Sequence, residues 1–180
     1  MEIWAKTLLS VYKYLDKIAG ALDELIRKKC IYSSFASNRQ DIFSQTDGVI
    51  SLMNRKIHII NLKVITEQAL AGLKLSDRKI IMLSYVDGVK CKDVANILKM
   101  PMRTYFRAKS KAVNSFANAL IRLGYTDAKL QEKYGSEHWL NKVYASAKEN
   151  KEVTQYTTSS FLQDVLSEFG KIKGHYYNYV

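Results

Sequence analysis

The chain has a single proline, Pro101, in 180 residues, together with eight glycines. Because proline and glycine are the residues that most often interrupt regular structure, their scarcity favours long helices joined by few tight turns. Little of the sequence alternates apolar and polar residues with a period of two, which is the pattern of a half-buried strand. The sequence therefore predicts an all-α protein, built as a helical bundle.

Apolar residues that recur every three or four positions predict the individual helices. The first is expected over residues 3–28, followed by a polar loop at 33–40 and by helices over 41–53 and 55–73. Ser76 has the side-chain chemistry of a helix N-cap, and Gly88 follows the expected end of that helix. A short helix is expected over 92–99. A longer one should begin at Pro101 or Met102, with Pro101 in its first turn, and end at Gly124.

Beyond Gly124 the pattern predicts two short helices on either side of Gly135 and another that ends at Gly170. The tyrosine-rich residues 171–180 are expected to be loose or docked on a partner. We therefore divide the chain into an N-terminal helical region (1–63), a central domain (64–124) and a C-terminal helical extension (125–180).

Composition excludes several classes of function. No segment approaches the ~20 consecutive apolar residues of a membrane span, and the N-terminal stretch, which includes Asp16, Asp23 and Glu24, does not resemble a secretory signal. A cytoplasmic protein without a membrane partner is expected. Two cysteines and three scattered histidines do not form a metal-binding pattern. We also find no phosphate-binding glycine loop and no nucleophile motif, so the sequence predicts neither an enzyme nor a cofactor.

Positive charge is concentrated in one part of the chain. The net charge is +11, and residues 74–122 hold 11 Lys/Arg against 3 acidic residues, a net of +8. Residues 123–180 hold seven of each. A basic cluster of this kind is the electrostatic footprint of a protein that binds a polyanion. The alternative is a solvated basic surface without a ligand.

The basic segment has the pattern of a helix-turn-helix. Such a motif needs a small residue where its second helix crosses the first, and Ala95 occupies that position. Projection of the second helix at 100° per residue separates two faces. The inward face comprises Tyr105, Ala108, Ala112, Phe116 and Leu120, and Val94, Leu98 and Met100 would pack against it. The outward face comprises Arg103, Phe106, Arg107, Ser110 and Asn114.

These outward residues have the chemistry of DNA readout. An arginine can donate two hydrogen bonds to a guanine edge, and apolar atoms can contact a thymine methyl group. Lysines at 90, 92, 99, 109 and 111 are placed for phosphate contacts, which position a protein without reading sequence. Two alternatives stay open: an ordinary pair of packed helices, and a Phe106 that packs against a neighbouring helix.

Residues 67–120, including "SDRKIIMLSYVDG", "KDVANIL" and "TYFRAKSKAV", resemble region four of bacterial RNA-polymerase sigma factors and the related regulators of phages and mobile elements. The resemblance implies that the last helix enters the major groove of promoter DNA. It implies that Met102, Arg103, Phe106 and Arg107 read the groove, with Lys111 near the backbone. The chain departs from the family pattern in three ways. Lys99 replaces the usual glycine or small polar residue of the turn, and Pro101 replaces the usual Ser or Thr cap of the last helix. Residues 1–66 lack a sigma region two. A sigma-like regulator is therefore expected instead of a complete sigma factor.

The predicted function is a sequence-specific DNA-binding transcriptional regulator that contacts RNA polymerase. Its expected partners are double-stranded DNA, RNA polymerase and further copies of the chain in a homo-oligomer. The expected DNA-binding residues are Lys92, Lys99, Met102, Arg103, Thr104, Phe106, Arg107, Ser110 and Lys111. Two alternatives remain: a phage or mobile-element DNA-recognition protein such as a packaging subunit, and a helical adaptor that binds protein through the Phe106 face and the tyrosine-rich tail.

Overall fold

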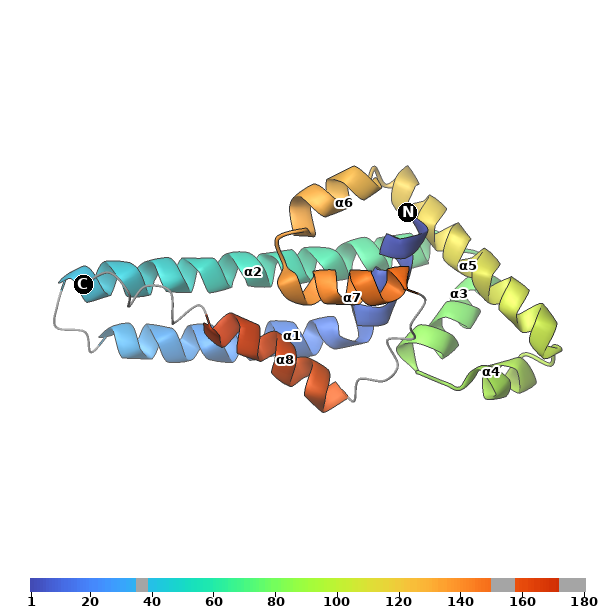
Figure 1. The fold of residues 1–180 in the computed structure, drawn as a ribbon, viewed down its shortest axis with the longest axis horizontal. Helices are drawn as coiled ribbons and strands as arrows, with labels where there is room; N and C mark the ends of the chain where they lie inside the picture. The colour runs from blue at the N-terminus through green and yellow to red at the C-terminus, as the bar shows by residue number, and fades with distance from the viewer. Residues whose placement is uncertain (35–38, 150–157, 172–180) are drawn as a thin grey trace. The chain divides into compact units, whose positions relative to one another are not determined.

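The computed structural model describes residues 1–34, 39–149 and 158–171. These residues form eight α-helices and one π-helical turn, and they include no strand (Figure 1). The prediction of an all-α fold is therefore confirmed. Among the described helices, none combines the length and the apolar character that crossing a membrane requires.

The chain forms two compact units, each built from segments that are distant in sequence. Unit 1 comprises Met1–Lys13 and Val64–Thr157, and unit 2 comprises Tyr14–Lys63 and Thr158–Val180. The two long helices, α1 (Glu2–Ser34) and α2 (Arg39–Ala71), contribute to both units. The sequence analysis instead divides the chain into three continuous regions, with boundaries after residues 63 and 124.

In unit 2, α1 and α2 run antiparallel, and two ion pairs mark their register. Lys56 Nζ lies 2.5 Å from Asp23 Oδ1, and Lys63 Nζ lies 2.6 Å from Asp16 Oδ1. The two pairs are seven residues apart on each helix, which is the repeat of a coiled coil. Because both carboxylates are exposed and both lysines are partly exposed, each pair contributes at most about 1 kcal/mol to stability. The core supplies the rest through the buried side chains of Tyr14, Leu15, Ile18, Leu22, Leu52, Ile59 and Leu62.

Helix α8 (Thr158–Lys171) adds an apolar stripe to unit 2. Phe161, Val165 and Phe169 follow one another at intervals of four residues and are buried. The ring of Phe161 lies 4.7 Å from that of Tyr14, and the guanidinium carbon of Arg55 lies 5.1 Å from the centre of the Phe169 ring. These contacts place α8 against both long helices within this unit.

Unit 1 contains the segment predicted as a helix-turn-helix. Helix α3 (Leu75–Ile81) continues into a π-helical turn, Met82–Val86, and is followed by α4 (Cys91–Ile97) and α5 (Met102–Arg122). Helices α3, α4 and α5 lie together in the ribbon (Figure 1). Two shorter helices, α6 (Asp127–Tyr134) and α7 (His138–Lys148), follow on either side of Gly135, as the sequence predicts.

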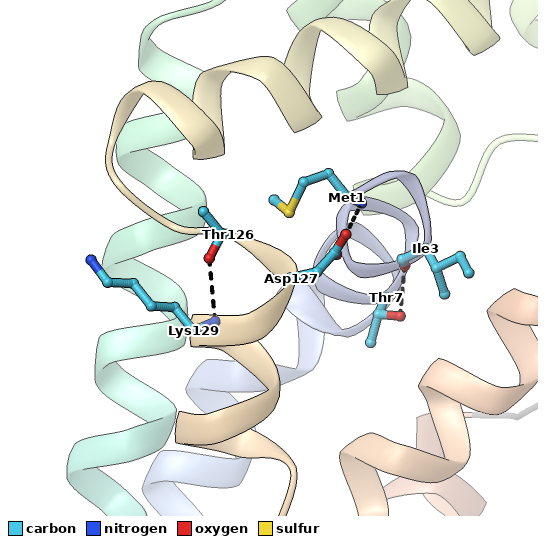
Figure 2. A network of polar contacts seen from close by, with 6 residues as sticks. All are labelled: Met1, Ile3, Thr7, Thr126, Asp127 and Lys129. Atoms are coloured by element: carbon cyan, nitrogen blue, oxygen red, sulfur yellow. Dashed lines mark hydrogen bonds and ion pairs between the residues drawn. The ribbon is translucent and has the colours of Figure 1, made fainter.

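The first turn of α1 and the start of α6 meet in unit 1 (Figure 2). The amine of Met1 forms an ion pair with the carboxylate of Asp127. The side-chain oxygen of Thr126 accepts a hydrogen bond of 3.3 Å from the backbone N–H of Lys129 and so caps α6. Trp4 and Trp139 are both buried, as expected for core residues, and the ring of Trp4 lies 4.9 Å from that of Tyr144.

The structure corrects several predicted helix boundaries. The predicted helices 41–53 and 55–73 are one helix, α2, because an exposed Asn54 does not interrupt a helix as proline would. Helix α1 extends beyond residue 28 to Ser34, so only residues 35–38 of the predicted loop 33–40 lie outside the described helices.

Three predicted helix ends also differ. The N-cap of α3 is Lys74, and Ser76 lies inside the first turn. Pro101 has extended backbone angles and is the N-cap of α5, one residue before its first turn. Gly170 does not end α8, which continues to Lys171. Most of the tyrosine-rich segment predicted at 171–180 lies outside the described residues.

Candidate nucleic-acid interface

The turn between α4 and α5 is closed by two backbone hydrogen bonds. The N–H of Met100 donates to the carbonyl of Ala95, and the N–H of Lys99 donates to the carbonyl of Asn96, each at 3.0 Å. This pair of bonds is a Schellman motif, which requires a left-handed residue just after the helix. Lys99 is that residue, with φ 51°. The turn is therefore sharp and fully hydrogen-bonded, and it fixes where α5 begins.

The inward side of α5 is buried as predicted. Four of its side chains are fully buried: Tyr105, Ala112, Phe116 and Leu120. Ala108 is half-buried. On α4, Val94 and Ala95 are buried, and Leu98 and Met100 are half-buried. The small side chain of Ala95 is thus in the core, in keeping with its predicted place at the helix crossing. This packing leaves α5 only one side on which polar residues can face water.

The outward side of α5 is exposed. Arg103 and Arg107 are four residues apart and Lys111 a further four, so the three cations lie within about 80° of one another around the helix axis. Every residue predicted to bind DNA is exposed: Lys92, Lys99, Met102, Arg103, Thr104, Phe106, Arg107, Ser110 and Lys111. Asn114 is exposed as well. The structure therefore brings the α5 members of the predicted set onto one accessible surface.

The electrostatic surroundings of this surface are positive. Residues 89–126 include eight Lys/Arg and one acidic residue, Asp93, a net of +7. Within residues 1–34, 39–149 and 158–171, no carboxylate forms an ion pair with Arg103, Arg107 or Lys111. Their guanidinium and ammonium groups can therefore bind an anionic ligand without first breaking an internal ion pair.

Phe106 is exposed beside the cationic surface. Its side chain is 52% accessible, and its ring centre lies 5.4 Å from that of Tyr105. The alternative in which Phe106 packs into a neighbouring helix is therefore wrong for this structure. Met102, one turn earlier on the same helix, is 39% accessible. Two apolar side chains beside two arginines offer contacts both to hydrogen-bond acceptors and to methyl groups.

Lys109 differs from the other lysines that were predicted to contact phosphate. It is half-buried, and its amine lies 5.0 Å from the centre of the Tyr85 ring. A cation over an aromatic face is a stabilising contact. Lys109 therefore helps to hold α5 against the π-helical turn, a role that its position among exposed lysines in the sequence did not indicate.

Sequence reasoning also missed how α3 is joined to α2. The Nε of Arg78 donates a 2.9 Å hydrogen bond to the carbonyl of Leu70, and its Nη2 donates a 2.6 Å bond to the carbonyl of Ala71. These carbonyls belong to the last turn of α2, where intrahelical donors are lacking. Arg78 was noted only as part of a family pattern, and the geometry assigns it the capping of α2.

Comparison with known proteins finds no family model, no curated protein and no solved structure that matches this chain. The evidence for the interface is therefore the arrangement of its own residues.

Proposed function

We propose that the protein is a sequence-specific DNA-binding transcriptional regulator that inserts the outward face of α5 into the major groove. The observation that carries this proposal is the set of exposed cations on that face, which form no ion pair among the described residues, on a helix whose opposite side is buried. A helix-turn-helix needs this division, because the recognition helix must be held rigidly and still present side chains to base edges.

Different residues on this surface would make different kinds of contact with DNA. Arg103 and Arg107 would donate paired hydrogen bonds to guanine, and Met102 and Phe106 would contact thymine methyl groups. Lys92, Lys99 and Lys111 would bind phosphates and set the position of the protein on the duplex. Thr104 and Ser110 carry hydroxyl groups that can bond to a base or a phosphate.

The resemblance of residues 67–120 to sigma region four supports a role at promoters. It is the basis for proposing RNA polymerase as a second partner. A native-gel experiment tests this part: polymerase should further retard the complex of the protein with its DNA. If the mobility of that complex does not change, the regulator acts without touching polymerase.

The main test is selection of bound duplexes from a random pool, followed by sequencing. The proposal expects one enriched motif, and it expects the affinity for that motif to fall steeply with salt as counterions are released. Equal and weak binding to every sequence would refute a sequence-specific regulator. A protein that assembles into a large ring would instead favour a packaging-type DNA-recognition subunit.

A protein-binding adaptor is the second candidate, because exposed Phe106 and Met102 could also enter a partner's groove. Charge reversal distinguishes the two functions. Arg103→Glu together with Arg107→Glu should abolish DNA binding and leave apolar docking through Phe106 in place. Loss of DNA binding with Phe106→Ala but not with the charge reversal would contradict the DNA-binding proposal.

A further inference from the structure

Helix α2 has a second apolar face that the described residues of unit 2 leave exposed. Phe43, Ile50, Met53, Ile57 and Ile60 are between 43% and 72% exposed. We refer to these five residues as the α2 stripe. At 100° per residue they lie roughly opposite Leu52, Ile59 and Leu62, the residues that α2 buries in the core. The helix is therefore apolar on two sides, and the described residues of unit 2 bury one of them.

The spacing of the α2 stripe is that of a coiled-coil seam. Steps of seven, three, four and three residues place Phe43, Ile50 and Ile57 at a positions, and Met53 and Ile60 at d positions. Thr46 takes the remaining d position. The stripe extends over about 25 Å of helix. Isolated exposed apolar residues are ordinary on a protein surface, but a continuous seam of this length is typical of an interface.

The charges beside the stripe indicate which partner it fits. One flank presents Asp47, Asn54 and Asn61, of which only Asp47 is charged. The other flank presents Val49 and Lys56, and Lys56 is already paired with Asp23 on α1. An acidic foreign helix would find no unpaired cation along this flank. A second copy of α2, in contrast, would meet the seam without a clash of like charges, despite the net charge of +11 on the whole chain.

The flank positions also bear on whether the two α2 helices run parallel or antiparallel. In a parallel, in-register pair, a residue at a g position faces the e-position residue five places later on the other helix. Val49 therefore faces Asn54, and Lys56 faces Asn61. We propose that the protein is a homodimer in which the α2 stripes of two copies pack as a parallel coiled coil. This interface is independent of the DNA-binding proposal, since its formation requires no DNA.

Sedimentation equilibrium of the full chain without DNA tests the dimer. We expect a mass of twice 20.6 kDa, about 41 kDa, at concentrations up to about 100 μM. Ile57→Glu should raise the dimer dissociation constant by at least about 100-fold, because two carboxylates would be buried in the seam. The matched control is Ile121→Glu on α5, where the isoleucine is 47% exposed against 52% for Ile57. A wild-type chain that stays at 20.6 kDa, or an Ile57→Glu variant that stays dimeric, would overturn the proposal.

Disulfide trapping tests the orientation in a background with both native cysteines removed, Cys30→Ser and Cys91→Ser. In a parallel pair, Ile50→Cys should crosslink to its own copy, and so should Ile57→Cys, because equivalent a positions bring the two Cα atoms within disulfide range. An antiparallel pair centred near Met53 would instead crosslink only a mixture of the two variants. That result would overturn the parallel arrangement, and it does not depend on whether Ile57→Glu folds.

Discussion

The phenol oxygen of Tyr105 lies 2.9 Å from the hydroxyl oxygen of Ser84, within hydrogen-bond distance. Tyr105 is in the first turn of α5 and is fully buried, and Ser84 is in the π-helical turn after α3. The N–H of Asp87 donates to the carbonyl of Met82, five residues earlier, which is the hydrogen bond that defines this turn. The Tyr105–Ser84 contact therefore joins the first turn of α5 to the π-helical turn that precedes α4.

Tyr105→Phe should reduce the free energy of unfolding by about 0.5–1.5 kcal/mol, because it removes the hydrogen bond and keeps the ring in the core. Ser84→Ala should cost at least as much, since it leaves a buried phenol without this partner. The double variant should then cost less than the sum of the two. Urea unfolding of the four proteins measures the coupling. Additive costs would mean that the two hydroxyls do not interact.

Lys99→Gly should stabilise the protein by about 0.5–1 kcal/mol, because Lys99 is in the left-handed conformation, which is costly for any residue with a Cβ. Gly124 provides an internal comparison. It closes α5 through the same pair of hydrogen bonds, from Gly124 to Ile121 and from Tyr125 to Leu120, with φ 84°. Gly124→Lys should accordingly destabilise the protein, as thermal unfolding would show. A lower melting temperature for Lys99→Gly would contradict this view of the turn.

Arg78→Ala should cost about 1–2 kcal/mol of stability. The change removes two charge-assisted hydrogen bonds from the last turn of α2 and a cation from the negative end of its dipole. Lys79→Ala is the control, because Lys79 is the exposed neighbour in the same helix. Chemical denaturation should separate the two variants clearly, and equal stabilities would show that the cap contributes nothing.

The bounds of the helices around Pro101 were predicted from the sequence better than those of α1 and α2, for a physical reason. Around Pro101 the signals are local: a proline, Gly88 after the π-helical turn, Gly124 after α5, and apolar residues with a single inward face. On α2 they conflict, because the helix is apolar on two sides. Ile59 and Leu62 are buried on one side, but the second apolar side obscured the helical period, and the predicted helix was divided at Asn54.

Contacts between distant residues were beyond what the sequence could predict. The cap that Arg78 provides, the Lys109–Tyr85 contact and the Ser84–Tyr105 bond each depend on how elements pack in three dimensions. Lys99 was noted as an unusual turn residue, but only the backbone angle shows that it adopts the left-handed conformation. The exposed face of α5 could be predicted because one helical period determines it, whereas its ligand depends on chemistry outside the chain.

Arg103→Ala and Arg107→Ala should each reduce the discrimination between the selected DNA motif and a duplex with one changed guanine, by about 1–3 kcal/mol. Arg122→Ala is the matched control, because Arg122 is an exposed arginine at the far end of the same helix. Fluorescence anisotropy with both duplexes provides the measurement. If all three variants behave alike, the arginines contribute only general charge, and the proposed groove face of α5 is wrong.

Lys111→Ala should weaken binding to all duplexes by a similar factor, because a phosphate contact carries no sequence information. The slope of log affinity against log salt concentration should become shallower by about one contact, close to 0.9 in magnitude for double-stranded DNA. Titrations over a range of salt concentrations, with the selected motif and a scrambled duplex, separate this effect from that of the arginines. A change in sequence preference with an unaltered slope would place Lys111 at a base edge, contrary to its position two turns beyond Arg103 on α5.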